Sequence, residues 1–275
     1  MHDRKLHSEH NYQHPKENQL KRIENYDKVL PILELYRCVQ SEGSRFGRPT
    51  IAVRTTGCTH RCYFGEGGWC DSFYTSIHPE KGTFTFNDII KIYDDNPHIK
   101  EMMLTGGSPT MHSALVNELT HFAHERNILI TIETEGSHFL ETDYPIDLIS
   151  LSPKFSNSVP QLGALTPNGK ETDERMIKQH NKFRLNHEAI LKTLKYHKDY
   201  HFKPVWDGTK ENLDEIEQFR ILTDIPKDKT YIMPAGDTRE TLIPMYKKVF
   251  RMCEEEGYNM TGRDHIIAFD TQREV

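Results

Sequence analysis

Three features are scarce in this chain of 275 residues: long hydrophobic runs, cysteine and an excess of positive charge. No apolar stretch approaches the roughly 20 residues of a membrane helix, and the first residues lack the apolar core of a secretory signal. We therefore expect no membrane contact and a location in the cytoplasm. The formal net charge of −6 offers no basic surface for a nucleic acid, so the expected partner is a small molecule.

Five cysteines are too few to read as a disulfide framework here, and three of them are clustered in a spacing C-x3-C-x7-C: Cys58, Cys62 and Cys70. They lie in a glycine-rich loop that follows the strand-like run 51–55. Three soft thiolates can bind three irons of a four-iron cluster and leave the fourth iron open, as a reactive site requires. The alternative is a structural zinc site with His60 as fourth ligand. Only one residue separates His60 from Cys62, which is an awkward spacing for two ligands of a tetrahedral site.

Two segments differ in composition. Residues 1–28 are polar, rich in histidine and lysine, and without apolar period, so we expect a flexible N-terminal extension. Residues 29–275 have the length of one catalytic domain, with strand patterns that alternate with helix patterns. This alternation predicts an α/β fold with a mostly parallel sheet and right-handed crossovers. Strands are expected at 32–36, 51–55, 101–104, 128–133, 147–151, 201–206 and 230–233. Helices are expected at 86–94, around 115–123, and at 188–196, 211–220 and 238–255, with a long polar lid or insertion at 156–184.

Distinctive residues follow the strands at the end where ligands bind in parallel sheets. After the cysteine loop come Thr105-Gly106-Gly107-Ser108-Pro109, Glu133-Thr134-Glu135-Gly136, Ser152-Pro153-Lys154 and Met233-Pro234-Ala235-Gly236. The glycines permit close backbone approach to an amino-acid moiety, with an ordinary turn as the alternative. Arg54 lies in an apolar strand and needs an anionic partner, either a substrate carboxylate or a protein carboxylate. Asp71 and Ser72 offer oxygen ligands for a hard cation, or simple turn chemistry.

The order of these motifs resembles the radical S-adenosylmethionine superfamily, and within it the 7-carboxy-7-deazaguanine synthases. The resemblance spans about residues 33–275. Besides the motifs above, it rests on Val39-Gln40-Ser41-Glu42-Gly43, Gly47-Arg48-Pro49, Gly57-Cys58, Cys70-Asp71-Ser72, and the C-terminal run from His265 to Val275.

The resemblance implies a partial (β/α) barrel, usually a homodimer, with a [4Fe-4S] cluster, S-adenosylmethionine and Mg²⁺. The implied metal ligands are Cys58, Cys62 and Cys70 for the cluster and Ser72 for Mg²⁺. The implied cofactor-binding residues are Trp69, Asp71, Gly106, Gly107, Ser152, Pro153, Lys154, Met233 and Pro234. The implied substrate-binding residues are Val39, Gln40, Ser41, Glu42, Arg54, Thr105, His265 and Val275, of which Gln40, Arg54 and His265 are assigned to catalysis.

The implied reaction converts 6-carboxy-5,6,7,8-tetrahydropterin to 7-carboxy-7-deazaguanine with loss of ammonia, and it needs an electron donor such as flavodoxin or ferredoxin. The sequence departs from the family pattern in the widened x7 gap, Ser41 for glycine, Ser72 for threonine and Ser108 for glutamate. Two alternatives are another radical S-adenosylmethionine enzyme, such as a glycyl-radical activase, and a zinc-stabilised binding protein.

Overall fold

Two sheets form the framework of the computed structural model, which describes residues 20–65, 68–76 and 78–275. The larger has the order β1-β2-β3-β4-β5-β6 and is parallel except for β1, which runs antiparallel to β2. The smaller is parallel, with the order β7-β8-β9. The strands are β1 Ile32–Val39, β2 Pro49–Thr55, β3 Glu101–Gly106, β4 Leu129–Thr134, β5 Leu148–Leu151, β6 Tyr200–Phe202, β7 Val205–Trp206, β8 Tyr231–Pro234 and β9 Asn259–Met260.

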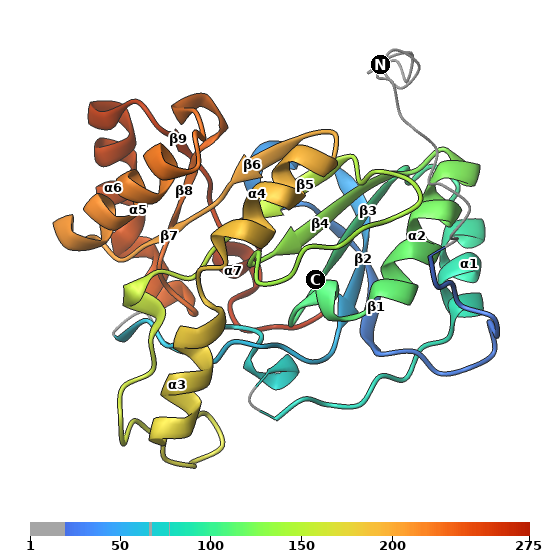
Figure 1. The fold of residues 1–275 in the computed structure, drawn as a ribbon, viewed down its shortest axis with the longest axis horizontal. Helices are drawn as coiled ribbons and strands as arrows, with labels where there is room; N and C mark the ends of the chain where they lie inside the picture. Colours follow the sequence, from blue (N-terminus) through green and yellow to red (C-terminus); the bar gives the residue numbers. More distant parts are fainter. Residues whose placement is uncertain (1–19, 66–67, 77) are drawn as a thin grey trace.

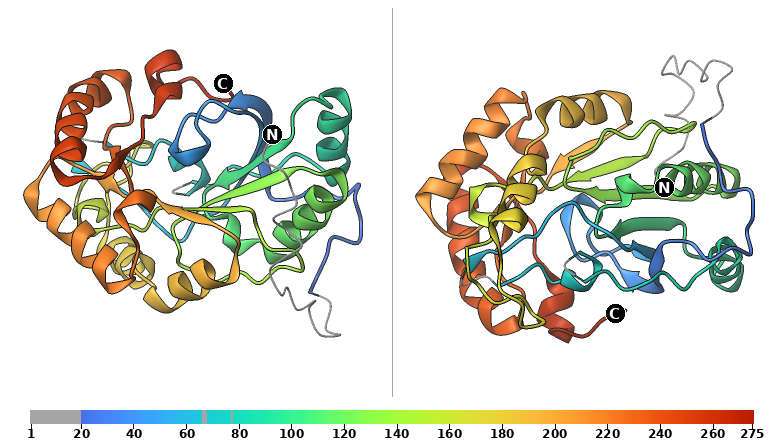
Figure 2. Two further views of the ribbon diagram at one scale, coloured as in Figure 1. Left: turned by 90° about the horizontal axis from the view of Figure 1, so that it is seen from above. Right: turned by 60° about the horizontal axis from the view of Figure 1, so that its bottom comes forward.

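Helices surround the strands as an outer layer (Figures 1 and 2). They are α1 Phe86–Asp95, α2 Ser113–Arg126, α3 Glu174–Phe183, α4 His187–Tyr196, α5 Lys210–Leu222, α6 Arg239–Glu256 and α7 Asp264–Phe269. Figure 1 shows α1 and α2 at one end of the large sheet, with α5 and α6 beside the small sheet at the other. A parallel bridge between Phe202 and Thr230 links the two sheets. None of the helices in the described residues has the length and apolarity needed to span a lipid bilayer.

The predicted mostly parallel α/β fold is confirmed, and every predicted strand is present. The apolar runs form strands because both faces of the sheet are covered: Ile51, Ala52 and Val53 of β2 are fully buried. One predicted strand, 201–206, is two strands in the structure. Pro204 lies between β6 and β7, and because proline lacks the N–H of a sheet ladder, the chain leaves one sheet there and joins the other.

Helix α3 was missed by the sequence reasoning, which expected no regular period in 156–184. Only His180 of this helix is fully buried. Met176, Ile177 and Phe183 are half-buried on the same face, too few apolar residues to stand out in so polar a segment. Its start carries the usual signal, because the side chain of Asp173 accepts a hydrogen bond from Met176 N at 2.8 Å. The last apolar run, 265–269, forms most of the short helix α7.

Part of the stretch predicted as an extension is described and lies against α1 and α2. Arg22 Nε is 2.7 Å from Glu118 Oε2, and the Tyr26 and Phe86 rings have centroids 4.5 Å apart. Residues 20–28 therefore contact α2 through an ion pair and α1 through an aromatic pair. The remainder of that predicted extension, 1–19, lies outside the described residues.

A capping box begins α1 and gives a first testable expectation. Asp88 N donates to Thr85 Oγ1 at 3.3 Å, and Thr85 N donates to Asp88 Oδ2 at 2.7 Å. Thr85→Ala is expected to lower the free energy of unfolding by about 1 kcal/mol, because it removes one partner of this box. Urea denaturation measures the change. Thr85→Ser keeps the hydroxyl and should lose less than half as much; equal losses in both variants would contradict a role for the cap.

Candidate active site

One cavity of about 760 Å³ contains almost all the side chains that the sequence singled out. It lies at the carboxyl ends of β2, β3, β4 and β5, where ligands bind in parallel sheets. Every predicted site residue lines it except Pro153 and Pro234, which are buried beside the lining residues Lys154 and Met233. The chain thus brings together segments more than 200 residues apart, from Val39 to Val275.

The cysteine loop reaches this cavity through a short hairpin that accounts for the widened gap. Phe64 N donates to Gly68 O at 2.8 Å, and Cys70 N donates to Cys62 O at 3.1 Å. The two cysteines at the ends of the x7 spacing are therefore neighbours across the hairpin. Trp69 helps to fix the hairpin: its ring packs at a tilt against Tyr63 with centroids 4.8 Å apart, and its indole N–H donates to Leu165 O at 3.0 Å.

The donor set fits an iron–sulfur group. All three loop thiols are free and face the cavity, and soft sulfur donors select such a group over a hard cation. Burial raises the pKa of Cys58 to about 12 and that of Cys70 to about 11, so binding of metal must displace protons. Across residues 20–65, 68–76 and 78–275 no three metal-binding side chains are already arranged as a site.

His60, the fourth ligand in the zinc alternative, is engaged on one side. Its Nδ1 lies 2.9 Å from Thr59 Oγ1 and 3.9 Å from Glu135 Oε1, and its ring packs edge-on against His180. Burial lowers the pKa of His60 to about 4, which keeps the ring neutral at pH 7. Nδ1 is therefore already engaged, and only Nε2, which has no hydrogen-bond partner among the described residues, would be available to zinc.

The two glycines after β3 pack against the cysteine loop with no room for a side chain. A Cβ on Gly107 would lie 2.1 Å from Gly57 O, and one on Gly106 would lie 2.3 Å from Thr55 O. Gly106 also has a φ of 135°, which side-chain-bearing residues rarely adopt. The N–H groups of Gly107 and Ser108 donate to Thr55 O and Gly57 O, so these two amides bind the protein and not a ligand.

Ser108 stands where the family pattern has glutamate, and its side chain is fully buried. Its hydroxyl donates to Glu135 Oε1 at 2.5 Å. Glu135 also accepts hydrogen bonds from Ser137 and Thr59. Although burial opposes ionisation of this carboxyl, His60 and the hydroxyls hold the pKa of Glu135 below its ordinary value. Ser108 thus helps to fix a buried carboxylate behind the cysteine loop.

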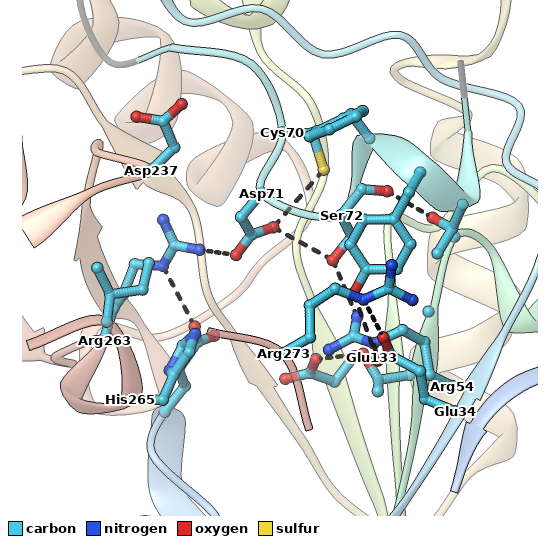
Figure 3. A pocket seen from close by; sticks show the side chains of 18 of the residues that line it. Glu34, Arg54, Cys70, Asp71, Ser72, Glu133, Asp237, Arg263, His265 and Arg273 are labelled. Carbon is cyan, nitrogen blue, oxygen red and sulfur yellow. Dashed lines mark hydrogen bonds and ion pairs between the residues drawn. The ribbon is translucent and has the colours of Figure 1, made fainter. Parts of the chain in front are cut away.

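A chain of alternating charges crosses the cavity from the cysteine loop to β4: Asp71, Arg263, Glu42, Lys203 and Glu133. Figure 3 shows three of them, Asp71, Arg263 and Glu133. Arg263 is paired with Asp71, and its Nε lies 3.3 Å from Glu42 Oε1. Lys203 is paired with Glu42 and lies 2.8 Å from Glu133 Oε1. Although burial opposes its ionisation, the cations Lys203 and Arg263 hold the pKa of Glu42 well below its usual range. The cavity therefore presents fixed carboxylates and fixed cations side by side.

Arg54 has the anionic partner that its position requires, and that partner is in the protein. Its Nε donates to Glu34 Oε2 at 2.6 Å, and its Nη1 donates to Ser72 Oγ at 2.9 Å. Glu34 is only 1% exposed, so this pair is largely desolvated. Of the two partners considered for Arg54, the structure supplies the protein carboxylate, while the guanidinium still lines the cavity.

The C-terminal residues complete the cavity wall. His265 Nδ1 lies 2.7 Å from Ser41 Oγ, which joins α7 to the loop after β1. Arg273 Nε donates to Glu34 Oε1 at 2.6 Å, and its guanidinium lies 3.7 Å from the centroid of the Tyr74 ring. Among the described residues, the hydrogen bonds and ion pairs that join 271–275 to strands or loops before residue 265 all involve Arg273.

Arg273 gives a second prediction. Arg273→Ala is expected to free the tail, because it removes the contacts to Glu34, Glu80 and Tyr74 together. Trimming of the C-terminus by carboxypeptidase should then accelerate on the order of tenfold, from the loss of one stacked, paired guanidinium. Arg273→Lys keeps the charge but not the planar guanidinium, so its trimming rate should lie between those of the wild type and Arg273→Ala. Equal trimming of wild type and Arg273→Ala would show that other contacts hold the tail.

Four residues of this site were missed by the sequence reasoning: Glu34, Lys203, Arg263 and Arg273. Lys203 carries the same signal that singled out Arg54, a single cation in an apolar strand. Glu34 alternates with apolar residues in β1 in the way of any half-buried strand. Nothing local to Arg263 or Arg273 marks them, because the carboxylates that pair with them lie 192 or more positions away.

Comparison with known proteins places this cavity in context. No family model matches the chain. A curated 7-carboxy-7-deazaguanine synthase of Halobacterium salinarum is 34% identical over 253 residues, covering 90% of this chain and 93% of the relative. The synthase of Rhodopirellula baltica is 30% identical over 247 residues, covering 90% and 89%. The crystal structure of QueE from Escherichia coli has a similar fold, with a TM-score of 0.53 and 17% identity over 85% of this chain and 93% of that one.

Proposed function

The chain belongs to the 7-carboxy-7-deazaguanine synthase family, and we propose from this premise that it converts 6-carboxy-5,6,7,8-tetrahydropterin to 7-carboxy-7-deazaguanine with release of ammonia. The observation that carries the proposal is the single cavity that joins three thiols to a set of carboxylates and cations. Product and ammonia together contain the atoms of the substrate, so the conversion needs no net oxidant.

The thiols of Cys58, Cys62 and Cys70 would hold the [4Fe-4S] cluster that the family implies. When bound, this cluster supplies the electron that cleaves S-adenosylmethionine and so starts radical chemistry. The protein would bind S-adenosylmethionine between the cysteine loop and the strand ends. The residues proposed for this are Trp69, Asp71, Gly106, Gly107, Ser152, Pro153, Lys154, Met233 and Pro234. Their support is that seven of the nine line the cavity beside the three cysteines.

A carboxylated pterin has one anionic group and one edge of N–H donors, and the cavity has complementary groups for both. Arg54 and His265 would face the carboxylate, while the carboxylates of Glu42 and Glu133 can accept from the pterin N–H groups. The remaining proposed substrate contacts are Val39, Gln40, Ser41, Thr105 and the Val275 carboxylate. Because Glu34 already fixes Arg54, the guanidinium is held in place before substrate arrives.

Further proposals concern partners and Mg²⁺. Asp71 and Ser72 would contribute oxygens to Mg²⁺ together with substrate, supported by the 3.3 Å contact between Ser72 Oγ and Asp71 Oδ1 at the cavity wall. We also propose a homodimer, and flavodoxin or ferredoxin as electron donor. The five free thiols support a reducing compartment such as the cytoplasm.

A substrate comparison tests the proposed function. Reconstituted protein with reductant, Mg²⁺ and S-adenosylmethionine is given 6-carboxytetrahydropterin or tetrahydropterin without the carboxyl group. We expect a ring-contracted deazaguanine product from the first only, because the cations of the cavity hold the substrate by its carboxylate. Formation of 5′-deoxyadenosine without a deazaguanine product would keep the radical chemistry and reject the substrate.

A further inference from the structure

Helix α3 contacts the cysteine loop through a hydrogen bond to one buried side chain, His180. His180 is fully buried, and its Nδ1 accepts a hydrogen bond from Arg61 N at 3.1 Å. Arg61 is the residue before Cys62, and its own guanidinium donates to Cys58 O at 2.8 Å. The backbone between two of the three cysteines is therefore fixed from the segment 156–184, which the sequence analysis expected to be a lid or insertion.

The other ring nitrogen of His180 secures the second side of Cys62. Since Nδ1 accepts from Arg61, the ring proton is on Nε2, which donates to Ser158 Oγ at 3.1 Å. The Ser158 hydroxyl in turn donates to Phe155 O at 2.6 Å, and Ser158 O accepts from Tyr63 N at 2.9 Å. The backbone N–H groups of Arg61 and Tyr63, on either side of Cys62, thus bind His180 and Ser158, which are hydrogen-bonded to each other.

We propose that His180 is a positioning residue for the iron–sulfur site: its neutral Nδ1, oriented by Ser158, holds the backbone between Cys58 and Cys62 in the conformation that receives the cluster. The inference rests on the proposed function for the identity of the cluster. The proposal gives α3 a role in holding the metal site. The cavity lining alone does not show this role, because His180 lies behind the cysteine loop and does not line the cavity.

Two isosteric substitutions separate this role from simple packing. His180→Asn places an amide oxygen where Nδ1 was and keeps the acceptor for Arg61 N, whereas His180→Gln places an amide near Nε2 and keeps only the Ser158 contact. His180→Leu keeps neither. His98→Leu is the matched control, since His98 is exposed on the loop after α1. Thermal unfolding of each variant shows that the fold is retained.

The first readout is backbone hydrogen exchange of a peptide containing Arg61 and Tyr63 in the metal-free protein. The second is iron per chain with the electron paramagnetic resonance signal of the reduced cluster. We expect His180→Asn and His98→Leu to match wild type within about twofold. His180→Gln and His180→Leu should show faster exchange and about tenfold weaker iron retention, with an altered resonance signal, as for loss of an outer-shell partner.

Equal behaviour of the Asn and Gln variants, or wild-type behaviour of the Leu variant, would overturn the proposal. A second outcome is that exchange follows the expected order but the wild-type protein retains no iron and sulfide. His180 would then stabilise the loop without positioning a cluster, and both the positioning role and the proposed function would be wrong. If iron is retained and turnover fails in every sample, only the substrate assignment is wrong.

Discussion

Cys62→Ala is expected to lose the iron–sulfur site and to reduce turnover to the level of metal-free protein. The reason is the number of ligands: three thiols face the cavity, and among the described residues no further side chain completes a metal site with two of them. Cys62 is also central to the loop, because its carbonyl accepts from Cys70 N at 3.1 Å and its neighbours are held by α3. An oxygen or water in its place is a poor substitute for a soft thiolate.

Iron and acid-labile sulfide per chain, with the visible absorption of the reconstituted protein, measure this effect. Cys253→Ala is the control, since Cys253 is buried on α6 and its thiol contacts Asn259 O. The control should keep its full iron content. Iron retained at the wild-type level by Cys62→Ala would contradict the ligand assignment, and zinc in place of iron in the wild-type protein would favour the zinc-binding alternative.

Lys203→Met is expected to be the most destabilising substitution in the cavity outside the cysteine loop. Lys203 is 3% exposed and neutralises both Glu42 and Glu133. Among the described residues, its removal leaves Glu133 without a cation and Glu42 with Arg263 alone. Breaking such a buried pair costs about 3–5 kcal/mol. The pterin should also bind less well, because its N–H edge would meet carboxylates that have lost their orientation.

The cost should depend on pH with a definite sign. In the wild type the pKa of Glu42 is lowered, so its ionised form contributes stability above the ordinary glutamate pKa of about 4.3, and this contribution is lost as the pH falls through the lowered folded-state pKa. In Lys203→Met, Glu42 keeps Arg263 but loses the second cation and its ionised form is less stabilised, so the variant should recover toward wild type as the pH falls from 7 to about 4.5. Urea denaturation at both pH values measures the difference.

Lys198→Met is a matched control on the same part of the chain. Lys198 lies 3.1 Å from Asp147, but its side chain is 32% exposed, so its loss should cost less than about 1 kcal/mol. The double variant Lys203→Met with Glu133→Gln should regain part of the loss, because the carboxylate that lost its cation is then neutral and Glu42 still has Arg263. A cost for Lys203→Met no larger than that for Lys198→Met would show that the charge chain is not structural.

The parts of the molecule that the sequence predicted well are those with local signals. Strands such as β2 and β5 are continuous apolar runs bounded by turns, and the capping box of α1 is complete within four residues. The motifs at the strand ends predicted one site, because the carboxyl ends of parallel strands meet at one edge of the sheet. The cavity is lined by residues at that edge. Helix α3 was missed because its few apolar residues do not stand out in so polar a segment.

What the sequence could not supply are pairings between distant residues. The partner of Arg54 was open between ligand and protein until Glu34 was seen beside it, in a strand that runs antiparallel to its own. The widened cysteine gap gave no reason to expect a hairpin that brings Cys70 beside Cys62. Arg263 and Lys203 meet Glu42 only after the whole chain has folded, and such contacts carry no signature in spacing or composition.

The central claim is that one cavity combines a three-thiol cluster site with a pterin site. Anaerobic turnover of the reconstituted protein with 6-carboxytetrahydropterin, S-adenosylmethionine, reductant and Mg²⁺, read by mass spectrometry together with an ammonia assay, tests it most directly. The account predicts 7-carboxy-7-deazaguanine and ammonia in equal amounts, both absent with Cys58→Ala. Neither product from a wild-type sample that contains iron and sulfide would contradict it.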